Sequence, residues 1–262
     1  MSFVDCEMGG GFANRMSKYA FARAYAEKHG ATLRTTPWKG EQVFDIEHPR
    51  MRIGELPVVD NINLEAWDGR VDIAIQGEAQ HQRCLIYSRA EARRWFTLRP
   101  EIKALLEPVP KFEIAAHLRW GDFQDANGFI AISKDSYRKA VRDFKIGDED
   151  GIRYISEEEP LLVPGVSEFK WRNRPTDEEP GLGFLPDWWA LCLADNILRG
   201  PSTFSWWAAV LGDHKRVFSP WQQGIPWQGT GRGFQDVPFV EGNHAPITCW
   251  WAGHSELHLR ET

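Results

Sequence analysis

The chain opens with FVDCEMGGGFAN (residues 3–14), which predicts a short strand, a glycine loop and the start of a helix. The strand covers Phe3 to Cys6, and the helix runs from about Asn14 to His29, with Gly30 where its C-terminal cap belongs. This order is typical of the start of a Rossmann-like domain. Spacings of three and four predict the apolar stripe of the helix: Met16, Tyr19, Ala20, Arg23, Ala24 and Glu27.

The rest of the first half gives weaker signals. Residues 32–35 and 71–75 predict strands, and residues 88–96 and 100–106 predict helices. Residues 37–68 show no clear periodicity, so no element is predicted there.

A cleaner alternation begins near residue 111, after the Pro108-Val109-Pro110 segment that can serve as a hinge. Strands alternate with helices, which favours a parallel sheet covered on both faces. The predicted strands are residues 114–118, 152–156, 196–198 and 216–219, and the predicted helices are 134–144, 186–194 and 203–211.

The sequence therefore predicts a compact α/β protein of two facing Rossmann-like domains, which bind ligands at the carboxyl ends of their strands. The N-terminal, acceptor-side domain spans residues 1–110, and the C-terminal, nucleotide-sugar domain spans residues 111–222. Residues 223–262 give no clear element and are expected to pack back on the domains.

The composition is that of a globular protein, with 42% hydrophobic and 26% charged residues. The net charge of -6 argues weakly against nucleic acid or anionic membranes as partners. The chain shows neither a basic leader nor a run of about 18 apolar residues, so we expect a soluble, cytoplasmic protein. No pair of cysteines has the close spacing of a zinc site, and the eight histidines are scattered without a convincing ligand pair, so no metal site is predicted.

The strand at residues 114–118 ends in the motif His117-Leu118-Arg119-Trp120-Gly121-Asp122. A guanidinium at this edge of the sheet can bind phosphate oxygens through paired, charge-assisted hydrogen bonds. The alternative is a structural salt bridge between Arg119 and Asp122, and the motif alone favours neither.

A second motif, Gly200-Pro201-Ser202-Thr203-Phe204-Ser205-Trp206-Trp207, joins a predicted strand to a predicted helix. Ser202 or Thr203 can cap the helix, and this is the favoured reading of the motif by itself. The start of a helix also binds phosphate, through its N–H groups and the positive end of its dipole. The two uses are compatible.

The opening loop, Gly10-Gly11-Phe12-Ala13-Asn14-Arg15, lacks the complete dinucleotide fingerprint and its downstream acidic residue. It is therefore a poor nicotinamide site. It does allow the backbone and the Asn14 amide to approach a substrate.

Together the motifs resemble those of the α-1,2-fucosyltransferases and of the wider group that includes the protein O-fucosyltransferases and α-1,6-fucosyltransferases. The opening loop is similar to the family's glycine-asparagine motif. His117 to Phe123 resembles His-x-Arg-Arg-Gly-Asp-Tyr, Tyr154 to Glu158 resembles Phe-Ser-Asp-Asp, and Gly200 to Ala208 resembles Asn-Ser-Ser-Phe-Ser-Trp-Trp-Gly. Trp120 departs from the pattern, since it stands where the family has a second arginine.

The resemblance implies a fold of the GT-B type and a metal-independent, inverting transfer of fucose from GDP-fucose to a glycan hydroxyl, with a galactoside 2-hydroxyl as the expected acceptor. No cofactor is implied. Arg119 would hold the β-phosphate of the donor, and His117 and Asp187 would contact the guanosine. The remaining donor contacts implied are Ser202, Thr203, Phe204 and, from the other domain, Asn14.

We expect a direct displacement without a covalent intermediate, in which Arg119 and the helix start at Thr203 meet the charge of the leaving diphosphate. Asp122 is the nearest candidate for the base, and bracing of Arg119 or of the loop is an equal alternative. The candidate catalytic residues are thus Arg119, Asp122 and Asn14. Asp187, which stands near the start of a predicted helix, can alternatively cap that helix.

Three competing functions remain open. Asp148-Glu149-Asp150 has the Asp-x-Asp form of manganese-dependent sugar transferases, but it precedes a predicted strand, whereas that motif should follow one. The thirteen tryptophans also allow a non-catalytic sugar-binding module. Trp120 leaves open a transferase that uses another GDP-sugar.

Overall fold

The computed structural model describes residues 2–64, 69–80, 82–120, 131–161, 181–221 and 234–243. The chain divides into two compact units, the first ending at Ile102 and the second beginning at Lys103. Helix α4 (Pro100–Leu106) contains this point of division. The candidate residue Asp122 lies outside the described residues.

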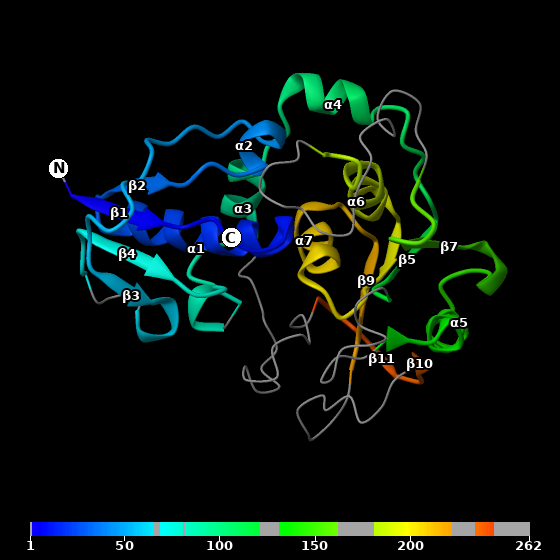
Figure 1. Ribbon diagram of the computed structural model, residues 1–262. Coiled ribbons are helices and arrows are strands. Elements are labelled where there is room, and N and C mark those ends of the chain that lie inside the picture. Colours follow the sequence, from blue (N-terminus) through cyan, green and yellow to red (C-terminus); the bar gives the residue numbers. More distant parts are fainter. Residues whose placement is uncertain are drawn as a thin grey trace. The chain divides into compact units, whose positions relative to one another are not determined.

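The first unit is built on a parallel sheet with the strand order β2-β1-β4-β3 (Figure 1). The strands are β1 (Phe3–Cys6), β2 (Thr32–Thr35), β3 (Val58–Asp60) and β4 (Ile73–Gln76). β1 and β4 are the central pair, with Cys6 opposite Ile75 near their carboxyl ends. The loops that follow these two strands therefore leave the sheet at the same edge.

Helix α1 (Phe12–Lys28) follows the glycine loop, and Gly30 ends it with a left-handed φ of 63°. Four residues of the predicted apolar stripe are buried, namely Met16, Tyr19, Ala20 and Ala24, but α1 also buries residues on nearly all its other sides. Arg23 and Glu27, predicted to lie in that stripe, instead form an ion pair of 2.8 Å between Nε and Oε1. A helix that is covered all round shows no simple stripe in its sequence.

The other helices of the first unit are short. They are α2 (Gly40–Val43) and α3 (Arg89–Trp95), with 3-10 turns at Asn61–Asn63 and Gln82–Cys84. Ser88 begins α3 with a capping box: its hydroxyl accepts the Glu91 N–H, and the Glu91 carboxylate accepts the Ser88 N–H.

The second unit is built on a five-stranded sheet with the order β11-β9-β8-β5-β7. Its strands pair in parallel except that β11 is antiparallel to β9, and β6 and β10 form a separate parallel pair. The strands are β5 (Ile114–Leu118), β6 (Ala131–Ile132), β7 (Ile152–Ser156), β8 (Asn196–Leu198), β9 (Arg216–Pro220), β10 (Phe234–Gln235) and β11 (Phe239–Glu241).

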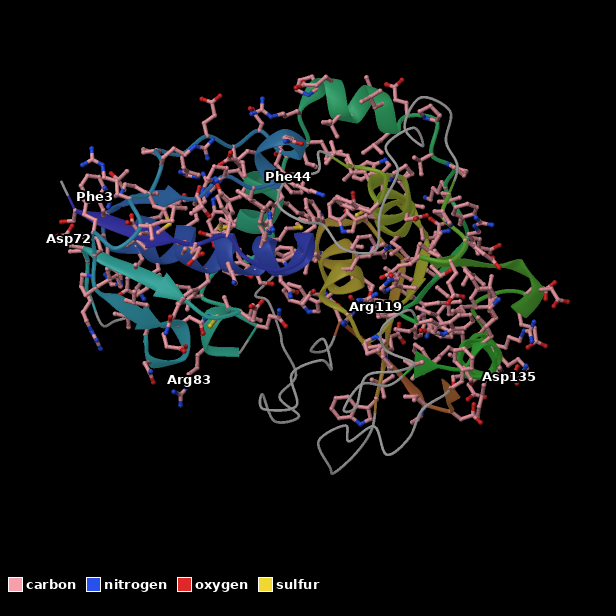
Figure 2. All side chains as sticks on the ribbon, in the orientation of Figure 1. Phe3, Phe44, Asp72, Arg83, Arg119 and Asp135 are labelled. Carbon is pink, nitrogen blue, oxygen red and sulfur yellow. The ribbon has the colours of Figure 1, made fainter. Side chains whose placement is uncertain are left out.

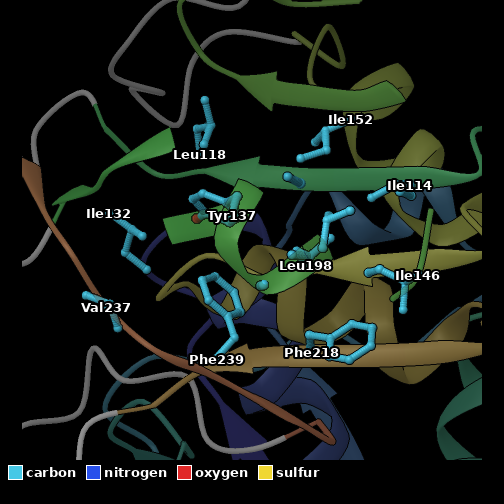
Figure 3. Close-up of a cluster of buried hydrophobic side chains, with 13 residues drawn as sticks. Ile114, Leu118, Ile132, Tyr137, Ile146, Ile152, Leu198, Phe218, Val237 and Phe239 are labelled. Atoms are coloured by element: carbon cyan, nitrogen blue, oxygen red, sulfur yellow. The ribbon is translucent and has the colours of Figure 1, made fainter. Parts of the chain in front are cut away.

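Helices cover both faces of this sheet, as predicted. Helix α5 (Lys134–Phe144) lies on one face, and α6 (Leu185–Leu193) and α7 (Thr203–Leu211) pack on each other over the opposite face (Figure 1). The core under α5 takes alternate residues of β5, namely Ile114, Ala116 and Leu118 (Figure 3). Because side chains alternate along a strand, His117 points to the α6 and α7 face. The predicted α/β class is confirmed.

β5 and β8 are neighbours, but the chain leaves them toward opposite faces of the sheet. After β5 it leads to α5, and after β8 it leads to α7. Open α/β sheets bind ligands outside the carboxyl ends of strands whose connections diverge in this way. The fold therefore places two of the sequence motifs at the expected ligand position of the second unit.

Within the described ranges, no helix has the length and apolar character that crossing a bilayer requires.

Candidate functional site

The end of β5 and the start of α7 meet at His117. The His117 carbonyl oxygen accepts a hydrogen bond from the Tyr137 hydroxyl at 2.8 Å. The centroid of the His117 ring lies 5.3 Å from that of the Phe204 ring. Gly200 approaches so closely that a β-carbon there would lie 2.6 Å from the His117 carbonyl oxygen. Only a glycine permits this approach of the loop after β8 to β5.

The buried His117 imidazole is neutral. Burial, followed by the positive charges of Arg119 and Arg199, lowers its pKa from 6.5 to about 3. Its Nδ1 is buried and has no hydrogen-bond partner among the described residues. Since buried polar atoms are normally satisfied, this nitrogen is a candidate contact for a bound ligand.

Arg119 lies just beyond the end of β5 (Figure 2) and forms an ion pair with Glu157, which directly follows β7. β5 and β7 are parallel neighbours, so both side chains stand at the carboxyl edge of the sheet. The contact uses Nη1 of Arg119, one of several donor atoms of a guanidinium. The side chains are 21% and 24% exposed, which leaves the pair within reach of a ligand.

Ser202 caps α7, as its motif predicted. Its hydroxyl accepts the Phe204 N–H at 3.2 Å, and Thr203 is the first residue of the helix. The Ser205 hydroxyl donates to the Gly200 carbonyl oxygen at 3.2 Å and fixes the turn before the helix. The positive end of the α7 dipole makes this position suitable for an anion.

A second guanidinium, that of Arg199, is completely buried directly after β8. Its Nη1 donates to the Ser219 hydroxyl at 2.9 Å and to the Asn243 Oδ1 at 2.7 Å. Burial lowers the pKa of Arg199 from 12.5 to about 9, so the group is still charged at neutral pH. Arg119 and Arg199 together create a positive potential around His117, which favours an anionic ligand.

Asp187 lies in the first turn of α6 and is 7% exposed. The alternative that it caps α6 is wrong, because Phe184 occupies the cap position and the Asp187 Oδ1 accepts the Leu161 N–H at 2.8 Å. Burial raises the pKa of Asp187 from 3.8 to about 6, against the opposing effects of the Leu161 N–H and the Arg153 charge. The Phe184 ring lies 6.2 Å from that of Phe204 and thereby joins the starts of α6 and α7.

The predicted site residues thus fall into four groups. Asn14 lies on α1 in the first unit, Asp187 lies on α6 in the second unit, and Asp122 is outside the described residues. The edge formed by β5 and the start of α7 brings together the remaining five: His117, Arg119, Ser202, Thr203 and Phe204.

Two residues of this edge were not among the predicted site residues. Glu157 belongs to a motif quoted from the sequence, and its position directly after a predicted strand could have suggested a role. Arg199 follows the apolar strand Asn196–Leu198, where a charged residue marks the carboxyl edge of the sheet.

Asp148-Glu149-Asp150 lies before β7, at the opposite edge of the sheet, as its position in the sequence indicated. The Asp148 Oδ1 accepts the Asp150 N–H at 3.0 Å, and Glu149 pairs with Arg142. These contacts stabilise the 3-10 turn Glu149–Gly151. Within the described part of the chain, no three His, Cys, Asp or Glu residues are grouped so that they could hold a metal ion.

No protein-family model and no curated protein sequence matches this chain. Solved structures do match it. NodZ α-1,6-fucosyltransferase soaked with GDP-fucose gives a TM-score of 0.51 at 17% identity, covering 92% of this chain and 99% of NodZ. Fucosyltransferase NodZ from Bradyrhizobium gives 0.51 at 17% identity, covering 92% and 98%. A mutant of Arabidopsis thaliana FUT1 in complex with GDP gives 0.51 at 13% identity, covering 91% and 76%.

This chain has the α/β fold of these fucosyltransferases. The match covers more than nine tenths of this chain for each of the three. What the likeness shows is the fold, and the chemistry must be argued from the residues.

Proposed function

We propose that this chain is an inverting, metal-independent glycosyltransferase that transfers fucose from GDP-fucose to a glycan hydroxyl. The observation that carries the proposal is the placement of Arg119 beside neutral His117 and the start of α7, at the carboxyl edge of β5 and β8. The fold shared with a fucosyltransferase soaked with GDP-fucose supports it.

The donor is bound by its diphosphate and its base. Arg119, Ser202 and Thr203 hold the β-phosphate, and Arg199 adds positive potential from inside the unit. Phe204 packs against the His117 ring, and His117 contacts the guanosine without adding charge. Asp187 accepts the donor groups of the guanine edge.

The reaction is a displacement at the anomeric carbon of the sugar. The acceptor oxygen forms a bond to that carbon from the side opposite GDP and loses its proton to a base, for which Asp122 is the candidate that the sequence offers. The bond from the carbon to the β-phosphate oxygen breaks, and its electron pair leaves with GDP. Arg119 and the dipole of α7 stabilise the negative charge that develops on the diphosphate, and such preorganised groups supply several kcal/mol.

The acceptor group that we propose is the 2-hydroxyl of a galactoside. This choice rests on the resemblance of residues 200–208 to the closing motif of the α-1,2-fucosyltransferases. NodZ is an α-1,6-fucosyltransferase with the same fold, so the fold by itself does not select the linkage.

Product analysis with a panel of GDP-sugars tests the proposal. Incubation with GDP-fucose and a galactoside is expected to release GDP and to yield a fucosylated product with inverted anomeric configuration. Transfer from a different GDP-sugar would show that the transferred sugar is not fucose and would leave the proposed guanine nucleotide donor in place. Glycan binding in the absence of nucleotide, with no transfer from any GDP-sugar, would make the chain a sugar-binding module and overturn the proposal.

The second expected result concerns metal ions. Because Arg119 and the start of α7 supply the electrostatic stabilisation, activity should persist in excess chelator. The measurement is the rate of GDP release before and after chelation. Loss of activity that manganese restores would contradict this result and overturn the proposed metal-independent transfer.

A further inference from the structure

Three consecutive glutamates follow β7 at the carboxyl edge of the second sheet, and the first of them is sheltered from solvent. Glu158 and Glu159 are exposed, whereas Glu157 is half-buried. The hydroxyl of Ser156, the buried last residue of β7, accepts the Glu159 N–H at 3.2 Å. This side-chain contact closes a tight turn around Glu157 and Glu158. The turn therefore fixes the backbone position from which the Glu157 side chain starts.

One oxygen of the Glu157 carboxylate is used, and the other is open to a ligand. Oε1 pairs with Arg119, and no described residue contacts Oε2. An ionised carboxylate only accepts hydrogen bonds, so Oε2 calls for a donor. A phosphate would be repelled, whereas a sugar hydroxyl donates to a carboxylate without adding charge. Glu157 is thus suited to a neutral, hydroxyl-bearing part of a ligand.

The segment from Glu157 to Leu161 joins the two ends of the proposed donor site. Its first residue pairs with Arg119, and its last donates its N–H to the Asp187 Oδ1 at 2.8 Å. Four residue steps span at most about 14 Å even when the backbone is fully extended. In GDP the ribose lies between the diphosphate and the base. A nucleotide held by Arg119 and Asp187 therefore presents its ribose to this short segment.

The topology of the sheet points to the same part of the nucleotide. β5, α5 and β7 form a β-α-β unit whose strands are parallel neighbours, with Leu118 opposite Ser156 at their ends. Arg119 and Glu157 directly follow this last pair of residues. In dinucleotide-binding folds, an acidic residue downstream of the phosphate-binding turn hydrogen-bonds the ribose 2′-hydroxyl. The carboxylate after β7 stands in a comparable place.

We propose that Glu157 accepts hydrogen bonds from the 2′- and 3′-hydroxyls of the donor ribose and thereby selects ribonucleotides over deoxyribonucleotides. The inference rests on the proposed function and assigns the part of the donor between its base and its diphosphate. Arg119, which pairs with the carboxylate, offsets the repulsion between Glu157 and the diphosphate. All of these residues belong to the second unit.

Isothermal titration of GDP, 2′-deoxy-GDP and 3′-deoxy-GDP tests this assignment. The wild type should bind GDP about tenfold or more tightly than either deoxy analogue, since hydrogen bonds to a charged group have about this effect. In Glu157→Ala this preference should disappear. Glu159→Ala removes the same charge from the same turn, and Glu241→Ala removes the partner of another arginine, Arg216. Both control variants should keep the wild-type preference.

The preference between nucleotides separates ribose binding from a merely structural carboxylate. If Glu157 only orients Arg119, its loss changes the affinities for all three nucleotides by the same factor, because all three carry the same diphosphate. A preference that persists in Glu157→Ala would therefore overturn the inference. Equal binding of GDP and both deoxy analogues by the wild type would overturn it too, while leaving the proposed function in place. A wild type that binds no GDP would overturn the proposed function, and this inference with it.

Discussion

Replacing Arg119 by lysine is expected to lower kcat/KM for sugar transfer by about two to three orders of magnitude, the range seen when one donor to a developing anion is removed. The Arg119 Nη1 pairs with Glu157, and a guanidinium carries five N–H donors in a planar fork that matches the geometry of phosphate oxygens. A lysine ammonium is a point charge that cannot make a paired contact with phosphate while it also contacts Glu157.

The arginine in the ion pair with Glu241 supplies the control for this variant. Arg216 contacts both oxygens of the Glu241 carboxylate at 2.7 Å, between β9 and β11 and away from the β5 edge. Arg216→Lys therefore loses a bidentate contact without touching the proposed donor site, and its kcat/KM should stay close to the wild-type value. Steady-state kinetics and thermal unfolding of both variants make the comparison.

Turnover near the wild-type rate in Arg119→Lys would overturn the proposal that Arg119 binds the phosphate of the donor. A loss of folded protein instead of activity would assign Arg119 a structural role with Glu157. That second outcome is not expected, because the pair is partly exposed and such pairs contribute only about 0–1 kcal/mol to stability.

The second half of the fold could be predicted closely because its strands are short apolar runs between polar loops. β5, β7 and β8, and the helices α5 and α7, begin and end at the predicted residues. Burial on both faces makes such strands almost continuously hydrophobic, and the alternation with helices then fixes the parallel order.

Residues 37–68 could not be predicted, because their elements are too short to show a period. α2 has four residues and β3 has three, and Val58 of β3 is exposed. These elements are held by pairing with distant residues, as where β3 pairs with β4. Tertiary contacts of this kind leave no local signal in a sequence.

In the candidate site, too, the features set by neighbouring residues could be predicted, and those set by residues far away in the sequence could not. The edge positions of His117 and Arg119 follow from the strand that precedes them, and the Ser202 cap follows from the helix after it. The partner of Arg119 is 38 residues away, and only the pairing of β5 with β7 brings Glu157 to it. Asp187 was given a possible capping role because it stands near the start of a predicted helix. Its actual partner, Leu161, is 26 residues away and left no local signal.

Replacing Asp187 by asparagine is expected to weaken GDP binding about tenfold to a hundredfold, and to change ADP and UDP binding little. Guanine presents a ring N–H and an amino group on one edge, and an ionised carboxylate can accept both. Adenine places an acceptor at the ring position, and uracil has no neighbouring amino group. Charge-assisted hydrogen bonds of this kind contribute about 1.5–3 kcal/mol each, which sets the expected loss.

The structure explains why the amide is a poor substitute. The Asp187 Oδ1 accepts the Leu161 N–H, and the carboxylate retains further lone pairs for the base. In Asp187→Asn the single carbonyl oxygen can keep the Leu161 contact, but the amide N–H groups then face the donors of guanine. Thermal stability at neutral pH should not fall, because the change removes a charge whose burial raises its pKa and so disfavours the ionised folded state.

The raised pKa also predicts how GDP binding depends on pH. Asp187 must be ionised to accept both guanine donors, and its pKa is about 6 in place of 3.8. GDP affinity should therefore be constant above this pKa and fall as the pH drops through it, by about tenfold for each further unit. In Asp187→Asn this dependence should disappear. Isothermal titration of GDP, ADP and UDP between pH 5 and about 8 measures both effects.

Asp195→Asn is the matched control, because Asp195 is an aspartate of the same unit that pairs with Lys111 and Lys215 at the surface. It should leave all three nucleotide affinities unchanged. An equal loss of GDP, ADP and UDP binding in Asp187→Asn, or no loss at all, would show that Asp187 only anchors Leu161. The residue-level reason for a guanine nucleotide would then be gone, while the phosphate site at Arg119 would stand, because it makes no use of the base.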